Sequence, residues 1–300
     1  MKIKKPVFII GSYRGGTSLL FRLLSESKDL WSLYRESNHF WKKYYRDPEE
    51  KSDTVILEKK EDGSFVNKVT GQNIFDLKKA REEMDKHYNF SSYNSYKLGY
   101  LGRVKAFRES LSWLFDLLNI CNYFSKSVFV RDYRVIDKTP PNMYRVEFLK
   151  NLYPDAKFIY LVRNKEENIA SLVSAWCHAS KFKYLYRKYL GEVDIKDYAG
   201  KVWKFFIPGD YLNWTQGKTI EEVCTHQYED AHQAAERAFR VMDPDDYIRL
   251  EFEDLLARPE DEVKNLCQFI GVEYTSRMQE IVREMPAVNT DIGFTSPVDL

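Results

Sequence analysis

The spacing of apolar residues divides the start of the chain into a strand, a loop and a helix. Residues 7–10, Val-Phe-Ile-Ile, form a short apolar run that stops at a glycine, as is typical of a strand buried on both faces. From Thr17 onward, leucines recur on one stripe at helical spacing. The first unit is therefore predicted to be a strand, a glycine-rich loop and a helix.

The same rhythm returns in the second half of the chain. Apolar runs predict strands within residues 133–142, 156–163 and 247–252. Helical periodicity predicts a helix ending near Tyr153 and helices over 166–176, about 219–242, about 259–270 and 277–284. This alternation predicts a three-layer α/β fold, in which helices cover both faces of a mainly parallel sheet of four or five strands.

The remaining segments are less regular. The pair Asp62-Gly63 lies between two alternating stretches and predicts a hairpin within 58–69, outside the main sheet. Residues 74–87 and 103–121 have the spacing of amphipathic helices. Since no repeat or low-complexity linker interrupts the sequence, we expect one domain over residues 1–300, with insertions at about 41–130 and 182–225.

Composition narrows the class of protein. The 44% hydrophobic residues can form a substantial core, and the net charge of +1 gives no reason to expect a nucleic-acid partner. The four cysteines are widely spaced, so we predict buried, reduced thiols and no metal site. The segment before the first strand is too short for a signal peptide or a membrane span, which favours a cytoplasmic protein without a transmembrane segment.

The first loop, "GSYRGGTSLL", nearly matches a phosphate-binding loop. Gly11, Gly16 and Ser18 keep the register of that motif, but Thr17 stands in the lysine position. Backbone N–H groups and the positive end of the helix converge at such a loop, so an anion can bind without the lysine, and Arg14 supplies a nearby cation. The alternative is a plain tight turn.

These residues resemble the 5'-phosphosulfate loop of the sulfotransferase family. "FIYLVRNKEENIASLVSAW" resembles the family's 3'-phosphate segment, and "VIDKTPPNMYRVEFLKNLYPDAKF" and "LEFEDLLARPEDEVKNLCQFIGVEY" resemble two further segments. The resemblance implies that the co-substrate is 3'-phosphoadenosine 5'-phosphosulfate (PAPS). It implies that the 5'-phosphosulfate is bound by Arg14, Gly15, Gly16, Thr17 and Ser18, and the 3'-phosphate by Arg163 and Ser171.

The position of Arg163 supports a ligand role independently of the family. It follows a predicted parallel strand at the sheet edge where open α/β folds bind ligands, and its guanidinium suits a phosphate. The alternative is a surface ion pair with Glu166 or Glu167. Ser171 taken alone is an ordinary helix residue.

Sulfuryl transfer to a hydroxyl requires fixed cations and a base. We expect Arg14 and Lys138 to stabilise the developing charge without a metal, Lys138 partly because the "DKTP" position resembles the family's. Glu36 matches the family's catalytic glutamate by spacing and flanking pattern, and His39 is the rival base. The acceptor is a small-molecule or carrier-bound hydroxyl, such as that of a carbohydrate, lipid or polyketide.

Two other functions remain open. A magnesium-dependent nucleotide or small-molecule kinase would use Asp137 and Ser18 at the metal, and a non-catalytic binding module would keep only the fold. The sequence also departs from the family at Phe252, where a tyrosine is usual. The aromatic-rich stretch 181–206 is predicted to be core, with an acceptor-binding wall as the alternative.

Overall fold

The computed structural model describes residues 2–33, 36–37, 56–67, 71, 73–74, 76–93, 132–178, 193–200, 203–206 and 214–285. A seven-stranded sheet forms the centre of the described chain. Its strands are β1 (Lys2–Ile3), β2 (Val7–Ile10), β3 (Leu30–Leu33), β7 (Ser92–Tyr93), β8 (Asp132–Lys138), β9 (Lys157–Val162) and β10 (Tyr247–Glu251).

The sheet is mainly parallel, as predicted. Its order is β10-β9-β2-β8-β3-β7, with β1 also paired to β8, and the five strands from β10 to β3 run parallel. Among the described strands of this sheet, only β7 is antiparallel, and it pairs with the edge of β3. No strand is predicted at β3, because a serine interrupts its four residues, Leu-Trp-Ser-Leu, whereas the equally short β2 is a continuous apolar run.

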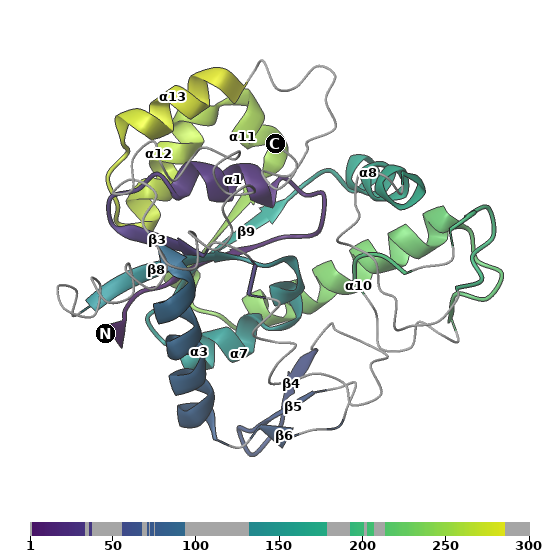
Figure 1. The fold of residues 1–300 in the computed structure, drawn as a ribbon, viewed down its shortest axis with the longest axis horizontal. Coiled ribbons are helices and arrows are strands. Elements are labelled where there is room, and N and C mark those ends of the chain that lie inside the picture. Colours follow the sequence, from purple (N-terminus) through teal and green to yellow (C-terminus); the bar gives the residue numbers. More distant parts are fainter. Residues whose placement is uncertain are drawn as a thin grey trace, which may run out of the picture.

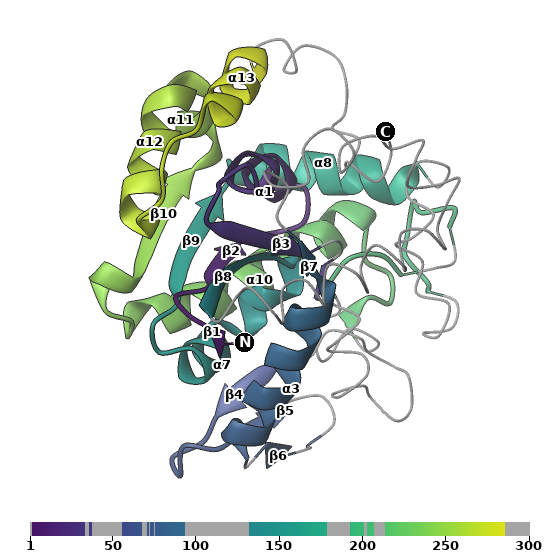
Figure 2. The same cartoon turned by 60° about the vertical axis from the view of Figure 1, so that its left-hand side comes forward.

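Helices cover both faces, which confirms the three-layer prediction. On one face lie α1 (Thr17–Leu24), α11 (Phe252–Ala257), α12 (Pro259–Ile270) and α13 (Ser276–Glu284), and on the other α3 (Leu77–Ser91), α7 (Val146–Leu152) and α10 (Ile220–Arg240) (Figures 1 and 2). The side of α3, α7 and α10 also includes the core residues of α8 (Lys165–Cys177). Two short 3-10 helices, η2 (Pro140–Tyr144) and η6 (Pro244–Asp246), are also described.

Strand alternation explains the two layers of core. On β2, Val7 and Ile9 pack with the α1 side, whereas Phe8 and Ile10 pack with the opposite side. All four side chains are buried, because successive residues of a central strand face opposite layers. A continuous apolar run is therefore what a strand between two helical layers needs.

A second, three-stranded antiparallel sheet lies apart from the main one. It contains β4 (Leu57–Lys59), β5 (Phe65–Asn67) and β6 (Asn73–Ile74). The β4–β5 hairpin turns at Asp62, whose carboxylate accepts hydrogen bonds from the backbone and side chain of Ser64. This confirms the predicted hairpin, while the helix predicted over 103–121 lies outside the described residues.

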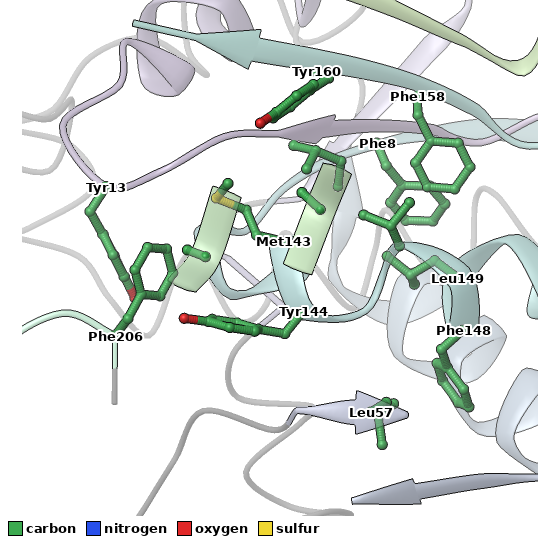
Figure 3. Close-up of a cluster of buried hydrophobic side chains, with 14 of the residues drawn as sticks. Phe8, Tyr13, Leu57, Met143, Tyr144, Phe148, Leu149, Phe158, Tyr160 and Phe206 are labelled. Atoms are coloured by element: carbon green, nitrogen blue, oxygen red, sulfur yellow. The ribbon is translucent and has the colours of Figure 1, made fainter. Parts of the chain in front are cut away.

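Part of the aromatic-rich stretch lies in the core. Trp203, Phe205 and Phe206 are buried, and Phe206 packs against Tyr13 of the glycine loop at 4.7 Å between ring centroids. Figure 3 shows Tyr13 and Phe206 beside Tyr144 of η2. These three described aromatics of the stretch therefore pack as core, as predicted, and do not form an exposed wall.

Strand register brings three loops to one edge of the sheet. Lys138 at the end of β8 lies opposite Ile9, and Tyr160 of β9 lies opposite Ile10. Because these strands are parallel, the loop after β2, the end of β8 and the residues after β9 meet at the same carboxyl edge. The candidate functional residues follow these strand ends.

Candidate active site

The glycine loop is shaped by close backbone packing. A Cβ at Gly11 would lie 2.7 Å from Thr17 Cγ2 and 2.8 Å from the carbonyl oxygen of Leu161. Gly16 has φ +84° at the N-cap of α1, and a Cβ there would lie 2.3 Å from the ring of Phe252. Only glycine fits these two places, so the loop turns directly into α1 with the helix N-terminus at its base.

Arg14 links the loop to both residues predicted for the other end of the nucleotide. Its Nε donates to Ser171 Oγ at 3.1 Å, and its carbonyl oxygen accepts from Arg163 Nη1 at 3.2 Å. Arg14 adopts φ +63°, a left-handed conformation that is uncommon for a residue with a side chain. The structure thus brings Arg14 together with Arg163 and Ser171, which lie 149 and 157 positions further along the sequence.

Arg163 also makes the ion pair expected under the alternative interpretation. Its Nη2 lies 3.0 Å from Glu167 Oε2, but the Glu167 side chain is 60% exposed, so the pair contributes little. The guanidinium carbon lies 5.4 Å from the ring centroid of Phe252. Its Nε is buried and has no hydrogen-bond partner among the described residues, so the group is only partly satisfied by the protein.

Asn168 lies behind the loop, on α8. Its Oδ1 accepts from Ser12 Oγ at 3.2 Å, and its buried Nδ2 lacks a partner among the described residues. The amide nitrogen is 3.4 Å from where a Gly15 Cβ would stand. Buried donors without protein partners call for an explanation, and both of these belong to side chains that contact the glycine loop.

Sequence reasoning missed the roles of Asn168 and Phe252. Nothing in the pattern of α8 distinguishes Asn168 from a polar surface residue, although it is fully buried. Phe252 was identified only as a departure from the family, within a predicted strand. In the structure it begins α11 and packs against both Gly16 and Arg163.

A second cluster forms where β8 ends. Lys138 Nζ lies 2.5 Å from Glu36 Oε1, and the two side chains are 12% and 31% exposed. The predicted base and one of the two predicted cations are therefore in direct contact. The rival base, His39, lies outside the described residues.

Asp137, the residue before Lys138 in β8, has a buried carboxylate. It is 1% exposed and accepts hydrogen bonds from four side chains, those of Ser37, Tyr88, Thr139 and Asn142. Burial raises the pKa of Asp137, and these hydrogen bonds oppose that rise. A magnesium-binding aspartate needs an accessible oxygen, whereas both oxygens of Asp137 face protein donors.

Other predictions have separate outcomes. Cys224 and Cys267 are buried free thiols, but Cys177 is exposed at the end of α8, so its predicted burial is wrong; Cys121 lies outside the described residues. Within the described ranges, no cluster of three or more His, Cys, Asp or Glu side chains is arranged to hold a metal ion. None of the helices in this part of the chain has the length and apolar character of a membrane span.

A protein family and several solved structures are similar to most of this chain. Residues 6–276 match the model of a family described as the sulfotransferase family. No curated protein gives a significant match. Similar solved structures include a sulfotransferase domain from the curacin biosynthetic pathway (15% identity, 100% of this chain and 84% of that chain, TM-score 0.49). A sulfotransferase from Mycobacterium tuberculosis is also similar (15% identity, 94% of this chain and 71% of that chain, TM-score 0.45). So is one from Alicyclobacillus acidocaldarius (16% identity, 96% of this chain and 97% of that chain, TM-score 0.43).

Proposed function

The chain belongs to the sulfotransferase family, an enzyme family that uses PAPS, and we propose that it transfers the sulfuryl group of PAPS to a hydroxyl of an acceptor. The acceptor class is a carbohydrate, lipid, polyketide or other small molecule, free or attached to a carrier. The observation that carries this proposal is the contact of Arg14 with both Arg163 and Ser171 at the carboxyl edge of the sheet.

In this proposal the two ends of the nucleotide bind on either side of the contact between Arg14 and the pair Arg163 and Ser171. Backbone N–H groups and hydroxyls over residues 14–18 bind the 5'-phosphosulfate, because the loop ends at a helix N-terminus. Arg163 and Ser171 bind the 3'-phosphate. Both now use donors or acceptors on Arg14, and Arg163 also uses the exposed carboxylate of Glu167, so a phosphate dianion can replace weak partners with charge-assisted hydrogen bonds.

The second cluster supplies the chemistry. The acceptor oxygen forms a bond to sulfur while the bond between sulfur and the 5'-phosphate oxygen breaks, and the acceptor proton passes to the Glu36 carboxylate. Lys138 and Arg14 stabilise the negative charge that grows on the leaving phosphate. His39 is the alternative base. With two cations at the transferred group, the reaction proceeds without a metal ion.

Binding tests the nucleotide half of the proposal. We expect adenosine 3',5'-bisphosphate (PAP) to bind in calorimetry equally with and without magnesium, and ATP to bind more weakly in both conditions. Arg163→Ala should weaken PAP binding by roughly 10- to 100-fold, as loss of a charge-assisted pair implies. Arg258→Ala is the matched control, because Arg258 also forms ion pairs with carboxylates four residues away but is the N-cap residue of α12, where its described ion pairs involve only Asp254 and Glu262. Magnesium-dependent binding of ATP in preference to PAP would support the kinase alternative.

Turnover tests the catalytic half. Labelled PAPS incubated with a panel of phenols, sugars and hydroxylated lipids should yield a labelled product with the wild-type protein. Glu36→Gln should keep PAP affinity and lose at least 100-fold in turnover, since general-base catalysis contributes on the order of 10²–10⁴. Unchanged turnover in Glu36→Gln would exclude Glu36 as the base and leave His39. A protein that binds PAP but transfers to no acceptor would favour the non-catalytic alternative.

A further inference from the structure

The hydrogen bonds around Asp137 connect segments that are far apart in the chain. Its Oδ2 accepts from Ser37 Oγ at 2.9 Å and from Tyr88 OH at 2.8 Å, and its Oδ1 accepts from Thr139 Oγ1 at 2.8 Å. Ser37 lies 100 positions before Asp137, and Tyr88 belongs to α3, in the predicted insertion. One buried carboxylate thus joins the segment after β3, the insertion helix and the end of β8.

The proposed catalytic pair is adjacent in sequence to this carboxylate on both sides. Glu36 precedes Ser37, and Lys138 follows Asp137. Since successive side chains of a strand face opposite sides, Asp137 points into the layer that contains Tyr88 while Lys138 points the other way, to Glu36. The same two backbone segments are therefore joined by two neighbouring contacts, that of Ser37 with Asp137 and that of Glu36 with Lys138.

A hydrogen bond from a backbone amide also connects these two segments. The amide of Ser37 donates to Thr139 Oγ1 at 2.8 Å, and the same hydroxyl donates to Asp137 Oδ1. Thr139 is fully buried, so its hydrogen bond with the Ser37 amide holds the backbone next to Glu36 in a defined position. Its geometry depends on the orientation of the Thr139 hydroxyl, which Asp137 determines by accepting its proton.

The buried charge has a buried counter-charge nearby. Asn142 Nδ2 donates to Asp137 Oδ2 at 3.3 Å, and Asn142 Oδ1 accepts from Arg145 Nη1 at 3.2 Å. Burial lowers the pKa of Arg145 to about 9, and the charge of Asp137 opposes that shift. An apolar side chain would fill the position of Asp137 at lower electrostatic cost, so a packing role alone does not account for an ionisable group there.

We propose that Asp137 is a positioning residue that holds the Glu36–Ser37 segment against the end of β8, so that Glu36 faces Lys138 and the transferred group. The inference rests on the proposed roles of Glu36 and Lys138. Asp137 itself touches no substrate. It acts through Ser37 and Thr139, and Tyr88 extends the same hydrogen-bond network to the insertion helix α3.

The test compares two pairs of matched variants. Tyr88→Phe removes the hydroxyl that donates to Asp137 at 2.8 Å. Tyr153→Phe removes a hydroxyl that donates, also at 2.8 Å, to Asp85, which lies in α3 like Tyr88. Thr139→Val removes the hydroxyl that accepts from Ser37, and Thr139→Ser retains it. Amide hydrogen exchange at Ser37, melting temperature, PAP affinity and consumption of labelled PAPS are measured for all four proteins.

We expect exchange at Ser37 to accelerate roughly 3- to 10-fold in Tyr88→Phe and more in Thr139→Val, as loss of a buried hydrogen bond implies. PAPS consumption should fall in the same order, while PAP affinity stays within twofold. Tyr153→Phe should lower the melting temperature as much as Tyr88→Phe without changing exchange at Ser37. Thr139→Ser should behave like wild type in exchange and turnover.

Equal exchange at Ser37 in Tyr88→Phe and Tyr153→Phe, or unchanged exchange in Thr139→Val, would overturn the inference. Failure of the proposed function has a different signature. If PAP does not bind, the proposed function fails. If Glu36→Gln consumes PAPS at the wild-type rate, Glu36 is not the base. In both cases exchange at Ser37 still decides whether Asp137 holds this segment.

Discussion

Close backbone packing determines the conformation of the loop after β2, whereas side-chain hydrogen bonds determine the conformation at the end of β8. Gly11 and Gly16 allow contacts with Leu161 and Phe252 that any Cβ would prevent. Asp137, in contrast, gathers hydroxyl and amide donors from three segments. Under the proposed function, the first region offers N–H groups to the nucleotide, and the second orients charged side chains toward the transferred group.

The difference teaches how each region responds to change. A backbone loop has no substitute for its glycines, so one added methyl group disturbs both folding and binding. A network of side-chain hydrogen bonds can lose a single donor and keep its fold, because the other donors still satisfy the carboxylate. Substitutions at the loop glycines should therefore act on stability and binding together, and loss of a single donor from the network should act on turnover.

The largest expected effect on stability follows from removing the centre of the network. Asp137→Ala leaves four buried donors without their acceptor and removes the negative charge near Arg145, so the free energy of unfolding should fall by about 4 kcal/mol. Urea denaturation followed by circular dichroism measures this loss. A loss below about 1 kcal/mol would mean that the network contributes little to the fold.

Gly16→Ala should come next and should act on both stability and binding. The new Cβ meets the Phe252 ring in a left-handed conformation, so we expect a loss of about 3 kcal/mol and of detectable PAP binding. Gly63→Ala is the matched control, since Gly63 has φ +80° with nothing within 4 Å of its Cβ. That variant should show only the conformational cost, about 1 kcal/mol, and bind PAP normally. Similar PAP binding by the two variants would contradict the role of the loop.

Ser171→Ala should have a smaller effect that is confined to binding. Loss of one hydroxyl at the 3'-phosphate should weaken PAP binding by roughly tenfold, or ~1.4 kcal/mol. Ser174→Ala, at an exposed position three residues further along α8, is the control and should bind as wild type. Calorimetry on both variants distinguishes them. Equal affinities would remove Ser171 from the nucleotide site.

The smallest expected effect concerns a cap far from both regions. Thr219 and Glu222 form a capping box at the start of α10. Thr219→Ala should lower the free energy of unfolding by about 1 kcal/mol and leave PAP affinity and turnover unchanged. The variant therefore shows how much of any activity loss elsewhere reflects reduced stability alone. Loss of PAP binding in Thr219→Ala would mean that the site depends on global stability.

Local signals made the loop and most of the sheet predictable. The run Val7–Ile10, the glycines after it and the leucine stripe of α1 lie within 18 residues, so their pattern alone indicates strand, loop and helix. Elements with an interrupted pattern were harder to predict. A serine breaks the apolar run of β3, and α11 begins at Phe252, where the apolar pattern continues that of the preceding strand.

The role of Asp137 could not be predicted, because it depends on contacts over long sequence distances. As a sequence feature, it suggested only a metal ligand beside Lys138. Its actual partners include Ser37 and Tyr88, 100 and 49 positions away, and neither carries a local signal. Cys177 shows the same limit, since its exposure depends on where α8 ends relative to the rest of the fold.

A crystal structure with PAP tests the central claim most directly. The account predicts the 5'-phosphate against the backbone of residues 14–18 and the 3'-phosphate within hydrogen-bond distance of Arg163 and Ser171. It also predicts that Glu36 and Lys138 remain in contact beside the 5'-phosphate. PAP bound elsewhere, or a 3'-phosphate in solvent while Arg163 keeps its pair with Glu167, would contradict it.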